Sequence, residues 1–238
     1  VRDGDLPAVA DRRFLRSALI MRLVFARLLK PFRWRSPRAT ARMLMAFARA
    51  ERSSFFDMME AANTTSDLSR RAKYLSHAVD ENRHAQMFSL RAVELDPTLA
   101  FDDSVARADF EHLFTRLGET RFLAFVHLGE KRARAQMVMF RDELAAFEGT
   151  ARADTKTKAL LDAVMVDEAV HESYTREFLS TLAPEASELR SARFWELRRG
   201  WLRWGAASSG VLFTLTMWTL YVLLAPLALM ERMRPQLP

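Results

Sequence analysis

The chain contains no cysteine and little glycine or proline, and these shortages narrow both its chemistry and its fold. Without cysteine, its 238 residues form no disulfide, thiolate zinc site or iron-sulfur cluster, so a metal site must use carboxylates and imidazoles. There are 7 glycines and 8 prolines, and apolar–polar alternation bounded by turn residues is missing. The sequence therefore predicts an all-α fold.

The charge of the chain points to a membrane surface. The formal net charge is +6, and arginine supplies most of the basic side chains, an excess that a GC-rich genome would also produce. The basic residues cluster beside apolar stretches, whereas a nucleic-acid-binding surface would interleave them with aromatic side chains. We therefore expect a lipid bilayer, and no nucleic acid, as a partner.

Residues 1–35 predict a basic amphipathic helix. Apolar and arginine side chains are mixed over residues 7–30, and Pro31 then ends the run. A helix of this kind could lie on an anionic membrane or cover the rest of the protein. The sequence leaves both interpretations open.

Residues 36–183 predict a bundle of four long helices. Ser36 before a proline is a typical helix start, while the polar residues 63–67 and Gly149-Thr150 make short turns. Short turns join antiparallel neighbours, so two such pairs linked by a long crossover describe a four-helix bundle. The expected helices cover about residues 37–62, 68–95, 119–147 and 153–182, and the crossover at 96–118 has a short helix at about 110–117.

The C-terminal region, residues 184–238, contains a long uncharged segment. The 26 residues 205–230 carry no charge, which is long enough to cross a bilayer. Basic residues are more frequent before this segment than after it, so the positive-inside rule places the bundle on the cytoplasmic side of the membrane. A buried hairpin or a monotopic anchor is the alternative. Four aromatic residues could act as interfacial anchors: Trp201, Trp204, Trp218 and Tyr221.

The same six-residue motif occurs on two of the predicted helices. Residues 79–84 and 166–171 both read Val-Asp-Glu-x-x-His. A spacing of three residues places the glutamate and the histidine on one face of a helix. The motif predicts four metal ligands: Glu81, His84, Glu168 and His171. Fortuitous surface Glu-His pairs on an ordinary helical bundle are the alternative explanation.

Depth along the bundle selects one further carboxylate on each of the other two helices. Glu51 lies about 12 residues before the first turn and Glu81 about 14 after it. Glu130 lies about 19 residues before the second turn and Glu168 about 18 after it. Four inward glutamates at matching levels are better explained by cations than by packing. Rival carboxylates lie nearer to the helix ends: Glu60, Glu119 and Glu143.

Over about residues 37–182 the chain resembles the ferritin-like di-iron carboxylate proteins, in which two helices contribute one glutamate each and two contribute Glu-x-x-His. The resemblance implies two iron ions, although manganese or a mixed iron–manganese pair would suit the same donors. It also implies that Glu81 and Glu168 bridge the metals. The remaining ligands would be divided between the two ions: Glu51 and His84 on one, Glu130 and His171 on the other.

Further side chains are expected around these ligands. By the same resemblance, Asp80 and Asp167 would each orient a histidine ligand across the bundle. Four more residues could line the site: His77, His127, Tyr74 and Tyr174. For the two histidines, a hydrogen-bonded position in the core is the favoured interpretation. For the two tyrosines, an ordinary core position explains them equally well.

The leading functional hypothesis is a membrane-associated oxidase or oxygenase that activates O2. It would hydroxylate or desaturate a lipophilic substrate, such as a lipid or quinone, that arrives through the membrane. The chain has no flavin or iron-sulfur motif, so electrons would come from an external donor or reductase. Iron or peroxide handling, as in rubrerythrin-like or membrane-bound ferritin-like proteins, is the first alternative. A metal-stiffened, non-enzymatic subunit of a membrane protein complex is the second.

Overall fold

A computed structural model describes residues 36–100, 112–150, 153–200 and 216–220. Every regular element within these residues is a helix, which confirms the predicted all-α fold for this part of the chain. The predicted helices agree to within about three residues with those observed. These are α2 (Pro37–Thr64), α3 (Leu68–Leu95), α5 (Leu113–Leu117), α6 (Glu119–Ala145) and α7 (Thr155–Leu182), and a further helix covers residues 186–200.

Side chains immediately before three of the long helices fix where they begin. The Ser36 hydroxyl accepts a hydrogen bond from an amide in the first turn of α2, as expected of a serine at this position. The carboxylates of Asp67 and Asp154 accept hydrogen bonds in the same way from amides in the first turns of α3 and α7. Gly118 separates α5 from α6 with a φ of +75°, a conformation that favours glycine.

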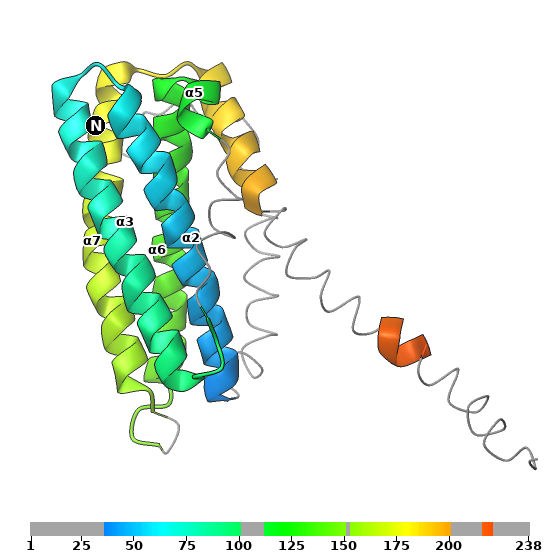
Figure 1. The fold of residues 1–238 in the computed structure, drawn as a ribbon. Helices are drawn as coiled ribbons and strands as arrows, with labels where there is room; N and C mark the ends of the chain where they lie inside the picture. The colour runs from blue at the N-terminus through cyan, green and yellow to red at the C-terminus, as the bar shows by residue number, and fades with distance from the viewer. Residues whose placement is uncertain (1–35, 101–111, 151–152, 201–215, 221–238) are drawn as a thin grey trace, which may run out of the picture. The chain divides into compact units, whose positions relative to one another are not determined.

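The four long helices lie side by side as two antiparallel pairs (Figure 1). α2 packs along α3, α6 packs along α7, and α3 contacts α7 between the pairs. α5 lies beside the turn between α2 and α3, where the Phe114 amide and the Thr115 hydroxyl donate to Glu60. α6 begins at this end too and therefore runs in the same direction as α3.

One carboxylate ties the start of α6 to the turn between α2 and α3. Glu119 accepts hydrogen bonds from Thr65, Arg70 and Tyr74 at 2.9, 2.7 and 3.1 Å. Burial, followed by the negative charge of Glu119, raises the pKa of Tyr74 above its ordinary value, so its hydroxyl keeps the proton that it donates. Glu119 is thus engaged in a structural contact at the end of the helices.

An apolar core fills the part of the bundle near the turn between α6 and α7. Phe47 meets Phe88 with ring centroids 5.3 Å apart, and it meets Phe140 edge-on with centroids 5.6 Å apart. Along every helix the buried members of this core stand on the same side of the predicted ligands: Ala41, Leu44, Met45, Ala48, Phe88, Ala92, Met137, Phe140, Leu144, Leu161 and Val164. Packed apolar side chains therefore border the predicted metal ligands on the side of the turn between α6 and α7.

The chain divides into two compact units, Val1–Ala192 and Arg193–Pro238, and α2 to α7 belong to the first. The predicted membrane segment at 205–230 lies mainly outside the described residues. Residues 216–220 are the part of it that the structure describes, and they are helical. Among the helices that the structure describes, none is long and apolar enough to cross a membrane. The predicted amphipathic helix in residues 1–35 also lies outside the described residues. Both membrane features therefore stay predictions.

Candidate metal centre

The structure brings the six predicted metal ligands together at one level of the four long helices. α2 and α6 contribute one glutamate each, and α3 and α7 contribute Glu-x-x-His. All six side chains are buried, and even the most exposed, Glu51, shows 7% of its surface. Helical spacing turns Glu81 and His84 inward together, and it does the same for Glu168 and His171.

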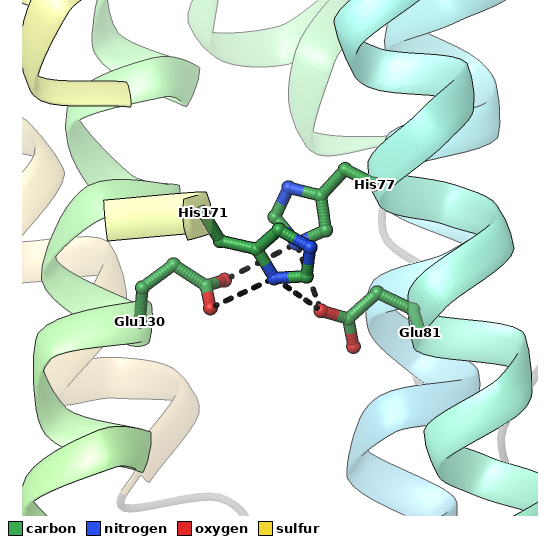
Figure 2. A group of neighbouring side chains, drawn as sticks. All are labelled: His77, Glu81, Glu130 and His171. Carbon is green, nitrogen blue, oxygen red and sulfur yellow. Dashed lines mark hydrogen bonds and ion pairs between the residues drawn. The ribbon is translucent and has the colours of Figure 1, made fainter. Parts of the chain in front are cut away.

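The ligand atoms form two groups that share Glu81. The first group places four atoms within 4.8 Å of one another, from Glu51, Glu81, His84 and Glu168. The second group, shown in Figure 2, does so with His77, Glu81, Glu130 and His171. Each group could hold one metal ion. Glu168 belongs to the first group, and its carboxyl also lies within hydrogen-bond reach of Glu130 in the second group, so the bridging role that the resemblance implied for it stays a prediction.

Contacts inside the groups have the spacing of ligands around an ion. His84 Nδ1 lies 3.6 Å from Glu168 Oε1. His171 Nδ1 lies 3.7 Å from Glu81 Oε1 and 3.8 Å from Glu130 Oε2. These distances are too long for hydrogen bonds. Two ligands that each stand about 2.0–2.2 Å from a shared transition-metal ion are roughly 3–4 Å apart, which matches the observed spacing.

Buried polar atoms without partners show that the residues fit a two-metal centre. With the carboxyl groups ionised, Nδ1 of His84 and of His171, both oxygens of Glu168 and Oε2 of Glu81 have no hydrogen-bond partner. Protonated Glu81 and Glu168 can instead share hydrogen bonds with Glu51 and Glu130. An unsatisfied buried polar group costs about 1–3 kcal/mol, and a charged one costs more. Two cations, one in each group, would satisfy all of these atoms together.

Glu81, Glu130 and Glu168 hold protons more tightly than ordinary carboxyl groups do. Burial, followed by the negative charge of Glu51, raises the pKa of Glu81 well above its usual range. Burial and the charge of Glu130 likewise raise the pKa of Glu168. Burial also raises the pKa of Glu130 to about 7. Metal binding to these groups therefore releases protons and strengthens as the pH rises.

Two aspartates and an arginine hold the ligand histidines from outside. His84 Nε2 donates to Asp167 at 3.0 Å. His171 Nε2 donates to Asp80 at 3.3 Å, so each pair links α3 to α7. Arg83 donates to both carboxylates, at 2.7 and 2.8 Å. With the hydrogen on Nε2, each ring turns the lone pair of Nδ1 towards its ligand group, which is the orienting role that the resemblance implied for the aspartates.

His77 joins the second group, although the sequence favoured a core role for it. Its Nε2 lies 2.8 Å from Glu81 Oε1 and 3.5 Å from Glu130 Oε1, while its Nδ1 lies 2.6 Å from the Tyr174 hydroxyl. The ring stacks on that of His171 with centroids 3.6 Å apart. Burial, followed by the charges of neighbouring histidines, lowers the pKa of His77 well below its ordinary value, so the ring is neutral, as a metal ligand must be.

The other two candidate residues lie outside both ligand groups. His127 Nδ1 donates to the Thr175 hydroxyl at 2.9 Å, and this hydroxyl donates in turn to the carbonyl oxygen of His171 at 2.7 Å. His127 is therefore a satisfied core histidine, as favoured from the sequence. Tyr74 is bound to Glu119 near the start of α6, so it does not line the groups.

The described part of the chain is thus helical and carries buried Glu and His groups that could hold metal ions. The geometry of these groups and the chemistry of their donor atoms indicate which ions they could bind. In comparisons with known proteins, no family model, no curated protein and no solved structure matches this chain.

Proposed function

We propose that this chain is a ferritin-like di-iron protein that uses O2 to oxidise a lipophilic substrate at a membrane. The observation that carries the proposal is the pair of overlapping ligand groups buried at one level of four packed helices. One glutamate from each of α2 and α6, with Glu-x-x-His from each of α3 and α7, is the ligand pattern of ferritin-like di-iron sites.

Iron suits the donors of both groups. Four glutamates nearly offset the charge of two divalent ions, and mixed carboxylate and imidazole donors suit iron, with manganese as the alternative. When bound, ferrous ions would supply electrons and open coordination positions for O2. Asp80, Asp167 and Arg83 hold two histidine rings in the orientation that such a site needs. The apolar core beside the ligand level limits access of water from that side.

The lipophilic substrate is proposed from the two ends of the chain. The uncharged residues 205–230 and the basic, amphipathic residues 1–35 would hold the bundle at a bilayer, on its cytoplasmic side. Hydroxylation would insert one oxygen atom of O2 into a C–H bond and release the other as water, consuming two electrons and two protons. Desaturation would use the same input and release two waters. A separate reductase would supply the electrons in either case.

Molecules that purify with the full-length protein separate this proposal from its alternatives. A lipid or quinone identified by mass spectrometry, together with iron in the protein, would support the oxidase. Ferrous oxidation over many turnovers into a mineral would assign the protein to iron handling. Two bound irons without any reaction with O2 would assign it to a structural role in a membrane complex.

Membrane association is the first testable consequence. Full-length protein is expected to float with lipid vesicles in a density gradient, because 26 uncharged residues are long enough to cross a bilayer. A variant that ends at residue 200 keeps residues 1–35, which alone would bind vesicles only reversibly, so it is expected to float far less than the full-length protein and still bind metal. Full-length protein that stays soluble without detergent and apart from the vesicles would contradict the expectation.

Loss of an outer carboxylate is expected to slow the reaction with O2 while most of the metal stays bound. Asp80→Ala or Asp167→Ala removes the acceptor of a ligand histidine, and such partners typically matter by about 10- to 100-fold. Stopped-flow absorbance and metal analysis measure the two effects. Asp162→Ala is the matched control, because Asp162 lies on α7 as Asp167 does and pairs with Lys158. Equal rates for all these variants would refute the orienting role.

A further inference from the structure

The two ligand groups differ in their donors. The first joins three carboxylates to one imidazole, whereas the second joins two carboxylates to two imidazoles because His77 takes part. Glu81 is common to both groups, so the difference comes from the residues that are not shared. These are Glu51, His84 and Glu168 in the first group, and His77, Glu130 and His171 in the second.

His77 has the two-sided arrangement of the other ligand histidines. The residue is 1% exposed, and one ring nitrogen is held from outside by Tyr174, much as aspartates hold His84 and His171. The other nitrogen, Nε2, faces the ligand group, 2.8 Å from Glu81 and 3.5 Å from Glu130. In Figure 2 both imidazole rings stand between the carboxylates of α6 and α3.

A purely structural role would make His77 a hydrogen-bond donor to Glu81. The Tyr174 hydroxyl can accept a hydrogen bond as well as donate one. It can therefore accept a hydrogen bond from the N–H at Nδ1 of His77, which leaves the lone pair of Nε2 free to bind an ion. Ligand atoms from Glu81, Glu130 and His171 all stand within 4.8 Å of one another and of a His77 nitrogen, which is more than one hydrogen bond requires. The geometry therefore favours direct coordination.

We propose that His77 is a direct ligand and that the centre is built for two unlike ions, Fe(II) in the second group and Mn(II) in the first. Imidazole favours iron, whereas carboxylate-rich donor sets suit manganese, and iron binds more tightly than manganese in general. When iron is limiting, it therefore fills the group with two imidazoles and leaves the other to manganese. This inference rests on the proposed two-metal centre and is independent of its reaction with O2.

The test is to locate each ion in protein loaded with both metals. Metal-free full-length protein receives one equivalent of Fe(II) and an excess of Mn(II) without oxygen, and anomalous diffraction at the two metal edges then identifies the ion in each group. Wild-type protein is expected to hold iron in the second group and manganese in the first. Elemental analysis is expected to count one of each per chain.

Two variants separate coordination from hydrogen bonding. His77→Gln keeps an N–H donor for Glu81 but offers no imidazole, so the preference of the second group for iron is expected to fall by about tenfold or more. Circular dichroism checks that the variant is folded. His127→Gln is the matched control, since His127 is a buried histidine outside both groups, and it is expected to sort the ions as the wild type does.

Iron and manganese spread evenly over both groups in the wild type would overturn the inference, and this measurement decides even if the variant fails to fold. Wild-type sorting in folded His77→Gln protein would also overturn it, because hydrogen bonding would then be sufficient. Either result leaves the two-metal centre standing. Protein that binds neither ion would instead overturn the proposed function itself.

Discussion

Replacing Glu81 with alanine is expected to abolish the loading of both metal ions, from two per chain to nearly none. Glu81 is the residue that the two ligand groups share, so its loss removes a ligand from each. It also removes the carboxylate nearest to His77 Nε2, at 2.8 Å, and one that faces His171 Nδ1, at 3.7 Å. Elemental analysis of the purified full-length variant measures the effect.

Glu51→Ala is the matched control for this experiment. Glu51 is a buried glutamate that belongs to the first group alone, so its loss is expected to leave about one ion per chain, in the second group. Circular dichroism of both variants shows whether the helices remain. Full metal content in folded Glu81→Ala protein would show that the assignment of the shared ligand is wrong.

Metal loading is expected to produce the largest change in thermal stability. An ion present at about 1,000 times its dissociation constant contributes roughly 4 kcal/mol to the folded state. One kcal/mol shifts the unfolding midpoint of a domain of this size by about 2–4 °C, so two ions together raise it by about 15–30 °C. Differential scanning calorimetry of the full-length protein in detergent, with and without Fe(II) under anaerobic conditions, checks this value.

The thermal-unfolding midpoint of the metal-free protein is expected to fall as the pH rises. Glu81, Glu130 and Glu168 have raised pKa values when folded, so the stability that their protons contribute is present at low pH and is lost as the pH rises, for Glu130 through about 7. His77 and His127 oppose this trend, because their lowered pKa values add stability as the pH rises towards their unfolded values.

Three carboxyl groups outweigh two histidines, so the metal-free midpoint is expected to fall between pH 5 and pH 7.5. Metal ions replace the protons, and the loaded protein is therefore expected to gain stability over the same interval. Thermal unfolding at both pH values, with and without metal, measures the two slopes. A metal-free midpoint that rises with pH would contradict the protonated state of the buried glutamates.

Much of the fold could be predicted because each helix of the bundle has local signals at its ends. Ser36 and Asp67 cap α2 and α3, and Gly118 precedes α6 in a conformation that favours glycine. Residue counts from the turns also predicted that Glu51 and Glu81 share a level, which is where the structure places them. Rise per residue in a helix is constant, so depth can be counted along the sequence.

The parts of the site that could not be predicted depend on contacts between helices. His77 lies one turn before Glu81, a position for which the sequence favoured a core role. Its assignment to the second group follows from a stack on His171 and a contact with Tyr174, both on α7. The role of Arg83 could not be predicted either. This half-exposed arginine forms ion pairs with Asp80 on α3 and Asp167 on α7, and the two carboxylates come together only in the folded bundle.

We propose a two-iron centre that reacts with O2, and stopped-flow absorbance tests that reaction. Anaerobic full-length protein with two ferrous ions demonstrably bound is mixed with O2-saturated buffer. The proposed oxidase predicts a change in the visible spectrum within a single turnover, and Glu81→Ala protein, which lacks the shared ligand, is expected to show none. No spectral change in the wild type with both irons bound would contradict the claim and assign the metals a structural role.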